Sequence, residues 1–522
     1  MKPAFILSSI IFFWGLISSN VFADVKPATI FQSNMVLQRD ISVPVWGRAD
    51  AGEQVEVAFA GQVKKTTADK YGKWQITLSP MKISTLGRKM IFKGKNQVVL
   101  DNILVGDVWI CGGQSNMEWS FKSKVTDGDK HMKESINYPL IRRVKINRNS
   151  SNDPVENAPT KYNWSVCHPK SISSWSAVAY YFARRVHAET GIPIGLIENN
   201  VGGSPIVLFI APSGFNNPES KGQWAISKPF VFGTPEYKKR VEENIAIYKK
   251  WLEEAEMAHR DGLPVPALPP VRHKPGYLSL YYYGMTAPIT RFPIKGAIWY
   301  QGCSDFRGDR IYERRMSELI NGWREAWKQD FPFYFMQLAG YQKATVDPKG
   351  GDGFALIREA QRNALRIPKT GMACSIDIGM QNDIHPKNKF DAGERLALLA
   401  LHDLYGKKDI VPSGPLFKSM EIKNGKVILS FDYAKGLMTA RKKGLSKPVP
   451  VNEKPAHFAI AGADKVWHWA DAVIDGEKII LSSGKVKNPV AVRYAFRSFP
   501  DGVNMYNAAG LPMVPFRTDN WK

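Results

Sequence analysis

Cysteine is scarce in this sequence. The 522 residues include four cysteines, at positions 111, 167, 303 and 374, and no two of them have the C-x-x-C spacing of a zinc site. So low a density excludes a small fold held together by a dense disulfide framework. One disulfide, two or none are all compatible with this count.

Acidic residues are also few. Lys and Arg number 71 against 48 Asp and Glu, which leaves a formal net charge of +23. Such a balance suits an acidic partner such as nucleic acid, anionic lipid or an acidic sugar. The basic residues, however, occur as dispersed pairs and triplets such as 142–143, 249–250 and 441–443, and not as one long stripe or arm. We therefore expect no nucleic-acid partner, and a merely basic surface is the simpler explanation.

Long apolar runs are absent after the N-terminus. Lys2 precedes an apolar stretch from Ala4 to Leu16, and small residues at Val21 and Ala23 would fit a cleavage site before Asp24. Residues 1–23 are thus predicted to be a secretory signal peptide. No later stretch has the roughly 18 to 20 uncharged residues that a membrane-spanning helix needs. We expect an exported protein, periplasmic or extracellular, without stable membrane insertion.

A sizeable core is predicted, because 44% of the residues are hydrophobic and 11% are aromatic. Residues 24–105 are expected to form an N-terminal β-sandwich. Short β-rich runs that lack helical periodicity are separated by turn signals in this segment: 42–46, 54–59, 73–78 and 97–100.

Residues 106–410 have a different pattern, in which apolar strands alternate with amphipathic helices. The predicted strands are 108–111, 192–197, 297–300, 333–338 and 372–377. The predicted helices are one capped by Ser176 that ends at Gly191, one along the apolar stripe 312–327, one bearing residues 356, 360 and 364, and one through residues 396–401. Such alternation predicts an α/β domain whose parallel sheet is covered by helices on both faces.

Two segments depart from this alternation. Residues 213–285 contain a polar helix around 236–256 and a proline-rich stretch at 262–270, and we interpret them as an insertion near the substrate. Residues 411–522 return to β patterning at 419–423, 426–431, 478–482 and 490–494. A C-terminal β-rich module is therefore expected.

The segment Gly112-Gly113-Gln114-Ser115-Asn116-Met117 directly follows the predicted strand that ends at Cys111. Glycines allow a sharp turn off the strand, and a serine on such a turn at a helix N-terminus has an exposed hydroxyl and a free N–H. Ser115 is therefore a candidate nucleophile, although an ordinary glycine turn with a capping serine would have the same sequence. Cys111 is more simply explained as a small core residue.

A serine nucleophile needs a base, and nine histidines are available. His385 differs from the others because Asp383-Ile384-His385-Pro386 lies between a predicted strand and the next helix. In parallel sheets, loops at the carboxyl ends of the strands carry the reactive groups. We therefore expect His385 to lie beside Ser115, although a surface turn with a solvated histidine is the plainer alternative.

Four ordered motifs carry a resemblance to a known family: 113–117 (GQSNM), 202–205 (GGSP), 298–302 (IWYQG) and 383–387 (DIHPK). Together with 35–38, 43–47 and 511–518, they make the chain similar to the sialate O-acetylesterase family, a branch of the SGNH hydrolases. The resemblance spans nearly all of the sequence after residue 23. It implies an SGNH-hydrolase-like parallel sheet with helices on both faces, flanked by the two β-rich modules.

The resemblance also implies roles for individual residues. Ser115 would attack the acetyl carbonyl and His385 would take and later return the proton. The oxyanion would face the N–H groups of Ser115 and Gly203 and the side chain of Gln301. Gln114, Asn116 and Arg358 would contact the substrate, and no metal or organic cofactor would be needed.

The sequence departs from the family at two places. Where the family usually has Glu after the Trp-Tyr-Gln-Gly strand, this chain has Cys303, and the position three before the histidine is Asn382. We assign Asp383 as the carboxylate that orients His385, with Asp377 or Asp305 as alternatives. A backbone carbonyl could also serve.

The leading functional hypothesis is a serine esterase that removes O-acetyl groups from a carbohydrate, most directly O-acetylated sialic acid. A first alternative is an esterase of acetylxylan or another plant polysaccharide. A second is a non-catalytic glycan-binding protein in which Cys303 marks a decayed site. A third is a basic surface protein that binds anionic polymer or lipid without turnover.

Overall fold

The computed structural model describes most of the chain. It covers residues 24–521 except for 216–217, 221, 223–224, 227, 231–232, 270–277 and 307–308. The predicted signal peptide, residues 1–23, lies outside the described residues and stays a prediction. No helix in the described ranges is long and apolar enough to cross a membrane.

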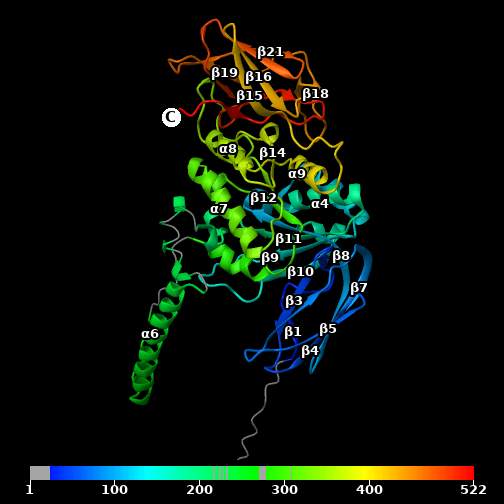
Figure 1. Cartoon of the computed structure of the whole chain (residues 1–522), viewed down its shortest axis with the longest axis vertical. Coiled ribbons are helices and arrows are strands. Elements are labelled where there is room, and N and C mark those ends of the chain that lie inside the picture. The colour runs from blue at the N-terminus through cyan, green and yellow to red at the C-terminus, as the bar shows by residue number, and fades with distance from the viewer. Residues whose placement is uncertain are drawn as a thin grey trace, which may run out of the picture.

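The centre of the molecule is a large mixed β-sheet (Figure 1). Its main path runs β10 (Thr160–Val166), β9 (Ile141–Ile146), β11 (Ile194–Asn200), β8 (Gln97–Gly113), β12 (Gly296–Tyr300), β13 (Phe333–Met336) and β14 (Thr370–Ala373). Neighbours from β9 to β14 are parallel, and only β10 pairs antiparallel along this path. The carboxyl ends of β8, β11, β12 and β14 consequently share one edge of the sheet.

Helices cover both faces of this sheet. Trp109 of β8 packs edge-on against Phe182 of α4 (Ala177–Thr190), and Tyr334 of β13 donates to Asp403 of α9 (Lys389–Leu404) on the same face. On the opposite face, Trp299 of β12 packs against Trp323 of α7 (Asp309–Trp327). Tertiary packing of this kind, more than helix propensity, stabilises amphipathic helices.

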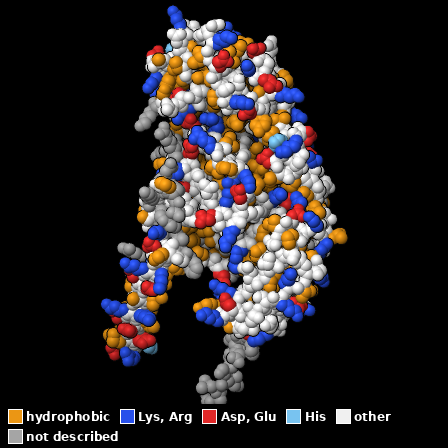
Figure 2. Space-filling view, in the orientation of Figure 1, with side chains coloured by type: hydrophobic (Ala, Val, Ile, Leu, Met, Phe, Trp, Pro, Cys, Tyr) orange, Lys and Arg blue, Asp and Glu red, His pale blue; other side chains and the backbone are white. Residues whose placement is uncertain are grey.

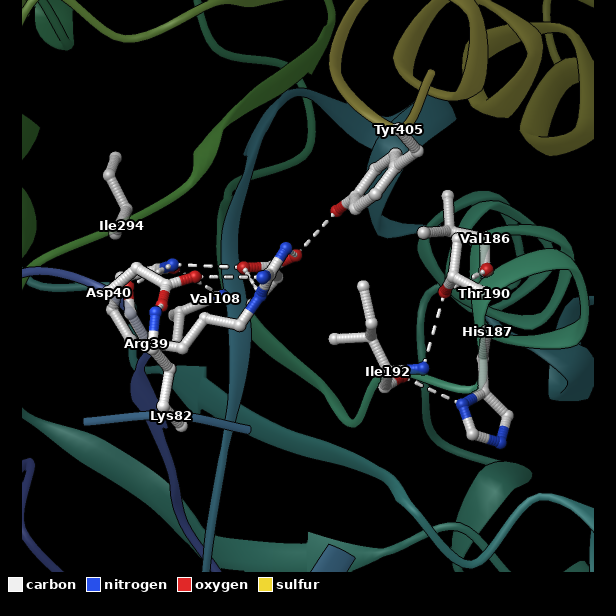
Figure 3. Close-up of polar contacts among 12 residues, drawn as sticks. Arg39, Asp40, Lys82, Val108, Val186, His187, Thr190, Ile192, Ile294 and Tyr405 are labelled. Carbon is white, nitrogen blue, oxygen red and sulfur yellow. Dashed lines mark hydrogen bonds and ion pairs between the residues drawn. The ribbon is translucent and has the colours of Figure 1, made fainter. Parts of the chain in front are cut away.

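The predicted ends of α4 are confirmed. The hydroxyl of Ser176 accepts from the N–H of Ala179, and Gly191 ends the helix in the left-handed conformation at φ 69°. His187 near that end contributes to the turn, since its Nδ1 lies 2.7 Å from the carbonyl oxygen of Ile192 (Figure 3). His187 is therefore a structural histidine.

Strand β8 differs from the sequence prediction. Two separate strands were expected at 97–100 and 108–111, but one strand runs from Gln97 to Gly113 and pairs with β7 (Ser84–Lys93) before it enters the central sheet. The sequence analysis ended the first of these strands at residue 100. Instead, Asn102 takes a positive φ of 58° beside an irregular pairing with β7, and the strand continues. The expected domain boundary near residue 105 therefore falls inside a continuous strand.

Asp107, in the middle of β8, is a fully buried carboxylate. It accepts hydrogen bonds from Gln38, from Arg39 at 3.0 and 3.1 Å, and from the hydroxyl of Tyr405 at 2.9 Å. Figure 3 shows Arg39 and Tyr405 converging from an N-terminal segment and from the end of α9. A buried charge is tolerated because its oxygen atoms are paired in this way. The network ties the N-terminal β region to the α/β region.

The N-terminal β region has two packed layers, as expected for a sandwich. One sheet has the order β1 (Lys26–Pro27), β3 (Val43–Arg48) and β6 (Lys73–Leu78); the other contains β2 (Val36–Gln38), β4 (Gln54–Phe59), β5 (Gln62–Thr67) and β7, joined to β8. Between the layers, the rings of Trp74 and Phe92 lie 5.9 Å apart.

The C-terminal β module has its own buried core, to which Leu429, Ile460 and Tyr494 belong. Its three sheets are β15 (Leu416–Lys423), β16 (Lys426–Asp432), β22 (Lys478–Ser482) and β21 (Asp471–Asp475); β18 (Val449–Pro450), β17 (Met438–Arg441) and β24 (Met505–Tyr506); and β20 (Trp467–Trp469), β19 (Phe458–Ala461), β23 (Ala491–Tyr494) and β25 (Phe516–Arg517). The module lies at the end of the molecule opposite the N-terminal β region (Figure 1).

The predicted insertion contains one long helix, α6 (Pro235–Arg260), which projects from the body of the molecule (Figure 1).

Lys and Arg side chains are spread among Asp and Glu over the visible face rather than gathered in one patch (Figure 2). The four cysteines, whose pairing the sequence left open, are buried and unpaired. The protein is thus a mixed α/β protein with additional β-rich sheets.

Candidate active site

Ser115 lies where β8 leaves the central sheet. It is the first residue of the short helix α1 (Ser115–Glu118), and Gly113 makes the turn before it at φ 135°. A Cβ atom on Gly113 would collide with the backbone carbonyl of Tyr300 on the adjacent strand. Glycine is therefore required there by both conformation and space. The turn presents the Ser115 hydroxyl at the carboxyl edge of the sheet.

His385 comes to the same place from the loop between β14 and α9. Its Nε2 lies 2.9 Å from Oγ of Ser115. The imidazole stacks on the indole of Trp119 with ring centres 4.6 Å apart and an interplanar angle of 17°. Two residues that are 270 positions apart in the chain therefore form a nucleophile–base pair with hydrogen-bonding geometry.

Asp383 is the carboxylate beside this histidine. Its Oδ1 accepts from the backbone N–H of His385 at 2.9 Å and lies 3.5 Å from Nδ1 of the ring. The two alternatives are engaged elsewhere: Asp377 forms an ion pair with Arg395 at 2.6 Å, and Asp305 accepts from Gln301. Of the three candidates, Asp383 is the one that reaches His385.

We expect Asp383→Asn to lower kcat by about 10- to 1000-fold, less than a full loss of the base. An acid that orients the imidazole fixes its tautomer and stabilises the imidazolium, but at 3.5 Å and a side-chain exposure of 33% the interaction is weakened by solvent. Steady-state hydrolysis of 4-nitrophenyl acetate measures the effect. Asp305→Asn is the matched control and should keep Ser115 and His385 in contact. If Asp305→Asn loses more activity than Asp383→Asn, Asp383 is not the carboxylate that orients His385.

The turn Gly202-Gly203 follows β11 and lies against Ser115. The N–H of Gly202 donates to Oε2 of Glu118 at 2.7 Å, and Gly203 has φ 70°. Within the described part of the chain, neither the N–H of Ser115 nor that of Gly203 has a hydrogen-bond acceptor. Free backbone N–H groups on two neighbouring turns are what an oxyanion hole needs. Glu118, which the sequence analysis missed, anchors one of these turns.

Gln301 is buried, and its amide is already used. Its Nε2 donates to the carbonyl of Ser204 at 3.1 Å and to Oδ2 of Asp305 at 2.6 Å, and its Oε1 accepts from the hydroxyl of Tyr312. Both amide hydrogens thus hold the surrounding loops together. In this structure the side chain predicted as a third oxyanion donor is a structural link between the loops.

The three residues predicted to contact the substrate have different positions in the structure. Oε1 of Gln114 accepts from the N–H groups of Gly302 and Ser304, so this side chain braces the site. Asn116 is buried next to Ser115. Arg358 lies apart from the pair: its guanidinium donates to the backbone carbonyls of residues 339, 497 and 498 and joins α8 (Phe354–Asn363) to the C-terminal module.

Both cysteines near the site are unsuited to nucleophilic chemistry. Burial raises the pKa of Cys111 well above its ordinary value and that of Cys303 to about 12. A thiol in this state carries almost no thiolate at neutral pH. Cys303, in the position where the family resemblance led us to expect Glu, accepts from Nδ2 of Asn116 at 3.8 Å. No cluster of metal-binding side chains occurs among the described residues.

Activity should persist into mildly acidic solution. Burial lowers the pKa of His385 below 6.5, the positive charge of Lys389 lowers it further, and Asp383 opposes both. Because the base must be neutral, a lowered pKa means that the proton that inactivates it binds only at lower pH. The acidic limb of kcat/KM, which reports the free enzyme, should therefore have its midpoint below pH 6.5. A midpoint above 6.5 in a pH series of kcat/KM would contradict this.

Known proteins that are similar to this chain are carbohydrate esterases. A family model described as "Carbohydrate esterase, sialic acid-specific acetylesterase" matches residues 283–401. The crystal structure of a carbohydrate acetylesterase from Xanthomonas citri is similar over 95% of this chain and 100% of its own, with 31% identity and a TM-score of 0.77. The chain belongs to the sialate O-acetylesterase family of carbohydrate esterases.

Curated members of this family are similar over most of their length. The sialate O-acetylesterase of Mus musculus is 26% identical over 94% of this chain and 93% of its own. The human enzyme is 25% identical over 80% of this chain and 78% of its own. The protein is accordingly a carboxylic ester hydrolase, and the family expected from the sequence motifs is confirmed.

Proposed function

We propose that the protein is an exported serine esterase that hydrolyses O-acetyl groups of carbohydrates and whose preferred substrate is O-acetylated sialic acid. Its active site would be built on an SGNH-hydrolase-like sheet. The observation that carries the proposal is the 2.9 Å contact between Ser115 Oγ and His385 Nε2, beside the N–H groups of Ser115 and Gly203, which have no acceptor among the described residues. A non-catalytic glycan-binding protein has no need of such a pair. The names of the relatives support an acetylated sugar as substrate.

In the first half of the reaction, Oγ of Ser115 bonds to the acetyl carbonyl carbon while Nε2 of His385 takes the hydroxyl proton. The carbonyl oxygen becomes an oxyanion that accepts from the N–H groups of Ser115 and Gly203. Each such donor contributes about 3 kcal/mol to the transition state. The carbon–oxygen bond to the sugar then breaks, and His385 returns its proton to the sugar oxygen.

In the second half, water attacks the acetyl-serine ester and gives its proton to His385. The intermediate collapses, acetate leaves, and Ser115 recovers its proton. Dividing the hydrolysis in this way replaces one difficult step by two easier ones. Asp383 stabilises the imidazolium that exists between the two proton transfers.

The choice of sugar rests on charge as well as on family. The net charge of +23 favours encounter with an anionic sugar by electrostatic steering, an effect that salt weakens. Acetylxylan, a neutral polymer, would not benefit. The positive charges are dispersed (Figure 2), so we expect steering to raise kcat/KM modestly and not to fix the substrate's pose.

The test is acetate release from O-acetylated sialic acid and from acetylxylan by the wild-type protein, with Ser115→Ala as the matched blank. We expect faster release from the sialic acid, and a rate on it that falls as salt is added. Faster release from acetylxylan would keep the serine esterase and overturn the sugar assignment. Equal release by wild type and Ser115→Ala from both substrates would overturn the esterase itself.

A further inference from the structure

Lys389 is a buried amine beside the proposed chemistry that the mechanism does not use. It is the first residue of α9, and only 1% of it is exposed. Its Nζ donates to Oδ1 of Asn116 at 2.5 Å and lies 5.2 and 5.6 Å from the ring centres of Trp119 and Tyr300. The hydrogen-bond partner of this ammonium is thus an amide and not a carboxylate. Burying an amine in this way is unfavourable for folding, so its presence calls for a functional account.

Through Asn116, the amine reaches the loop that carries the base. Asn116 directly follows Ser115, and while its Oδ1 is bound by Lys389, its Nδ2 donates to the carbonyl of Ile384 at 3.0 Å. Ile384 directly precedes His385. The amide therefore bridges the nucleophile turn and the histidine loop, and Lys389 fixes which way the amide faces, because only the oxygen can accept from an ammonium.

Through Trp119, the amine reaches the imidazole itself. Lys389 lies over the indole, and the indole stacks on His385. A cation at this distance from an indole is attracted to the ring. Both routes end at His385: one holds its backbone and the other packs its ring.

The charges around this pair set the expected sign of an electrostatic effect. His385 is faced by Ser115 of α1 and by Trp119, which follows that helix. Asp383 faces it from its own loop, and the positive charge of Lys389 faces it from α9. Burial lowers the pKa of Lys389 to about 7, against the opposing effects of Cys303 and Asp383. In the acidic range where His385 titrates, Lys389 is therefore protonated and disfavours a second positive charge on the imidazole.

We propose that Lys389 is a positioning residue of the esterase site, which holds His385 against Ser115 through Asn116 and Trp119 and keeps the imidazole unprotonated by its own positive charge. The proposal rests on the proposed function for its effect on turnover. Its electrostatic half, the effect of the Lys389 charge on protonation of His385, concerns the protein without substrate and can be measured without turnover.

The first experiment compares the titration of His385 in the wild type and in Lys389→Met, by NMR of protein labelled at the histidine ring carbons, with His385→Gln to assign the signal. Lys389→Met keeps the length and apolar stem and removes the charge. We expect the pKa of His385 to rise by about half a unit to one unit. An unchanged pKa would overturn the electrostatic half, and this readout stands even if the wild type proves to have no esterase activity.

Turnover tests the positioning half. We expect Lys389→Met to lower kcat for 4-nitrophenyl acetate by roughly 10- to 100-fold, because a small displacement of the base is costly, and to move the acidic limb of kcat/KM to higher pH. A merely structural lysine would lower the melting temperature without moving that limb. An unchanged kcat would overturn the positioning half, whereas an inactive wild type would overturn the proposed function instead.

Two further variants complete the design. Lys389→Gln retains a donor for Asn116 but no charge, so it should raise the pKa of His385 as Lys389→Met does while losing less kcat; it also carries the comparison if Lys389→Met does not fold. Lys407→Met removes the same charge beyond the other end of α9, about 24 Å away along a 16-residue helix. It should leave both the pKa and kcat at wild-type values, and a shift as large as that in Lys389→Met would overturn the proposal.

Discussion

Replacing Ser115 with Ala should lower kcat/KM for 4-nitrophenyl acetate by about 10⁴- to 10⁶-fold. The substitution removes the nucleophile that lies 2.9 Å from His385, and the thiols of Cys303 and Cys111 cannot take its place, since burial raises the pKa of both. Residual turnover would come from the N–H groups of Ser115 and Gly203, which the variant keeps. Initial rates at several enzyme concentrations measure the loss.

The control for this variant is Ser123→Ala, which removes a hydroxyl from the segment after α1 without touching the pair. It should keep the wild-type rate, and both variants should melt near the wild-type temperature. A Ser115→Ala protein that is folded and retains a tenth or more of the wild-type rate would mean that another group is the nucleophile.

Replacing His385 with Ala should have an effect of similar size. Without the imidazole the Ser115 hydroxyl has no base, and the sugar oxygen has no acid to protonate it as it leaves. Because the two side chains act as one unit, the double variant Ser115→Ala/His385→Ala should be no slower than either single variant. The same assay on all three proteins tests this.

Additive losses in that comparison would contradict the shared role. They would indicate that Ser115 and His385 act in separate steps, in spite of their contact. A further discriminating feature is pH: the small residual rate of His385→Ala should lack the acidic limb of the wild type, since the group that produces the limb is gone. A limb that persists at the same pH would assign it to another residue.

The part of the site that could be predicted from the sequence is the part set by strand ends. Ser115 follows β8 and His385 follows β14, and parallel strands bring such positions to one edge of the sheet. The capping residues Ser176 and Gly191 likewise have local causes. These predictions needed only periodicity and turn chemistry.

What could not be predicted depends on packing between distant segments. Gln301 has its amide hydrogens occupied by Ser204 and Asp305, and a sequence pattern contains no information on such a network. Arg358, predicted to contact the substrate, is buried against the C-terminal module. Lys389 lies two residues after the motif 383–387, and only the fold shows that it is buried.

The strand β8 illustrates a third kind of difference. Two strands were predicted, at 97–100 and 108–111, but pairing with β7 and β11 carries one strand through the polar residues between them. Asp107 is accommodated because Arg39 and Tyr405 reach it from segments that are remote in the sequence. Tertiary contacts here override a local signal.

The most direct test of the account is to look for the acetyl group on Ser115. Wild-type protein is mixed with 4-nitrophenyl acetate, quenched in acid within a turnover, digested and examined by mass spectrometry, with Ser115→Ala treated in parallel. The account predicts one acetyl group on the peptide that contains Ser115, present at early times, lost on incubation without substrate, and absent from the variant. Steady turnover with no acetyl group on Ser115, or with a transient acetyl group on another residue in both proteins, would contradict it.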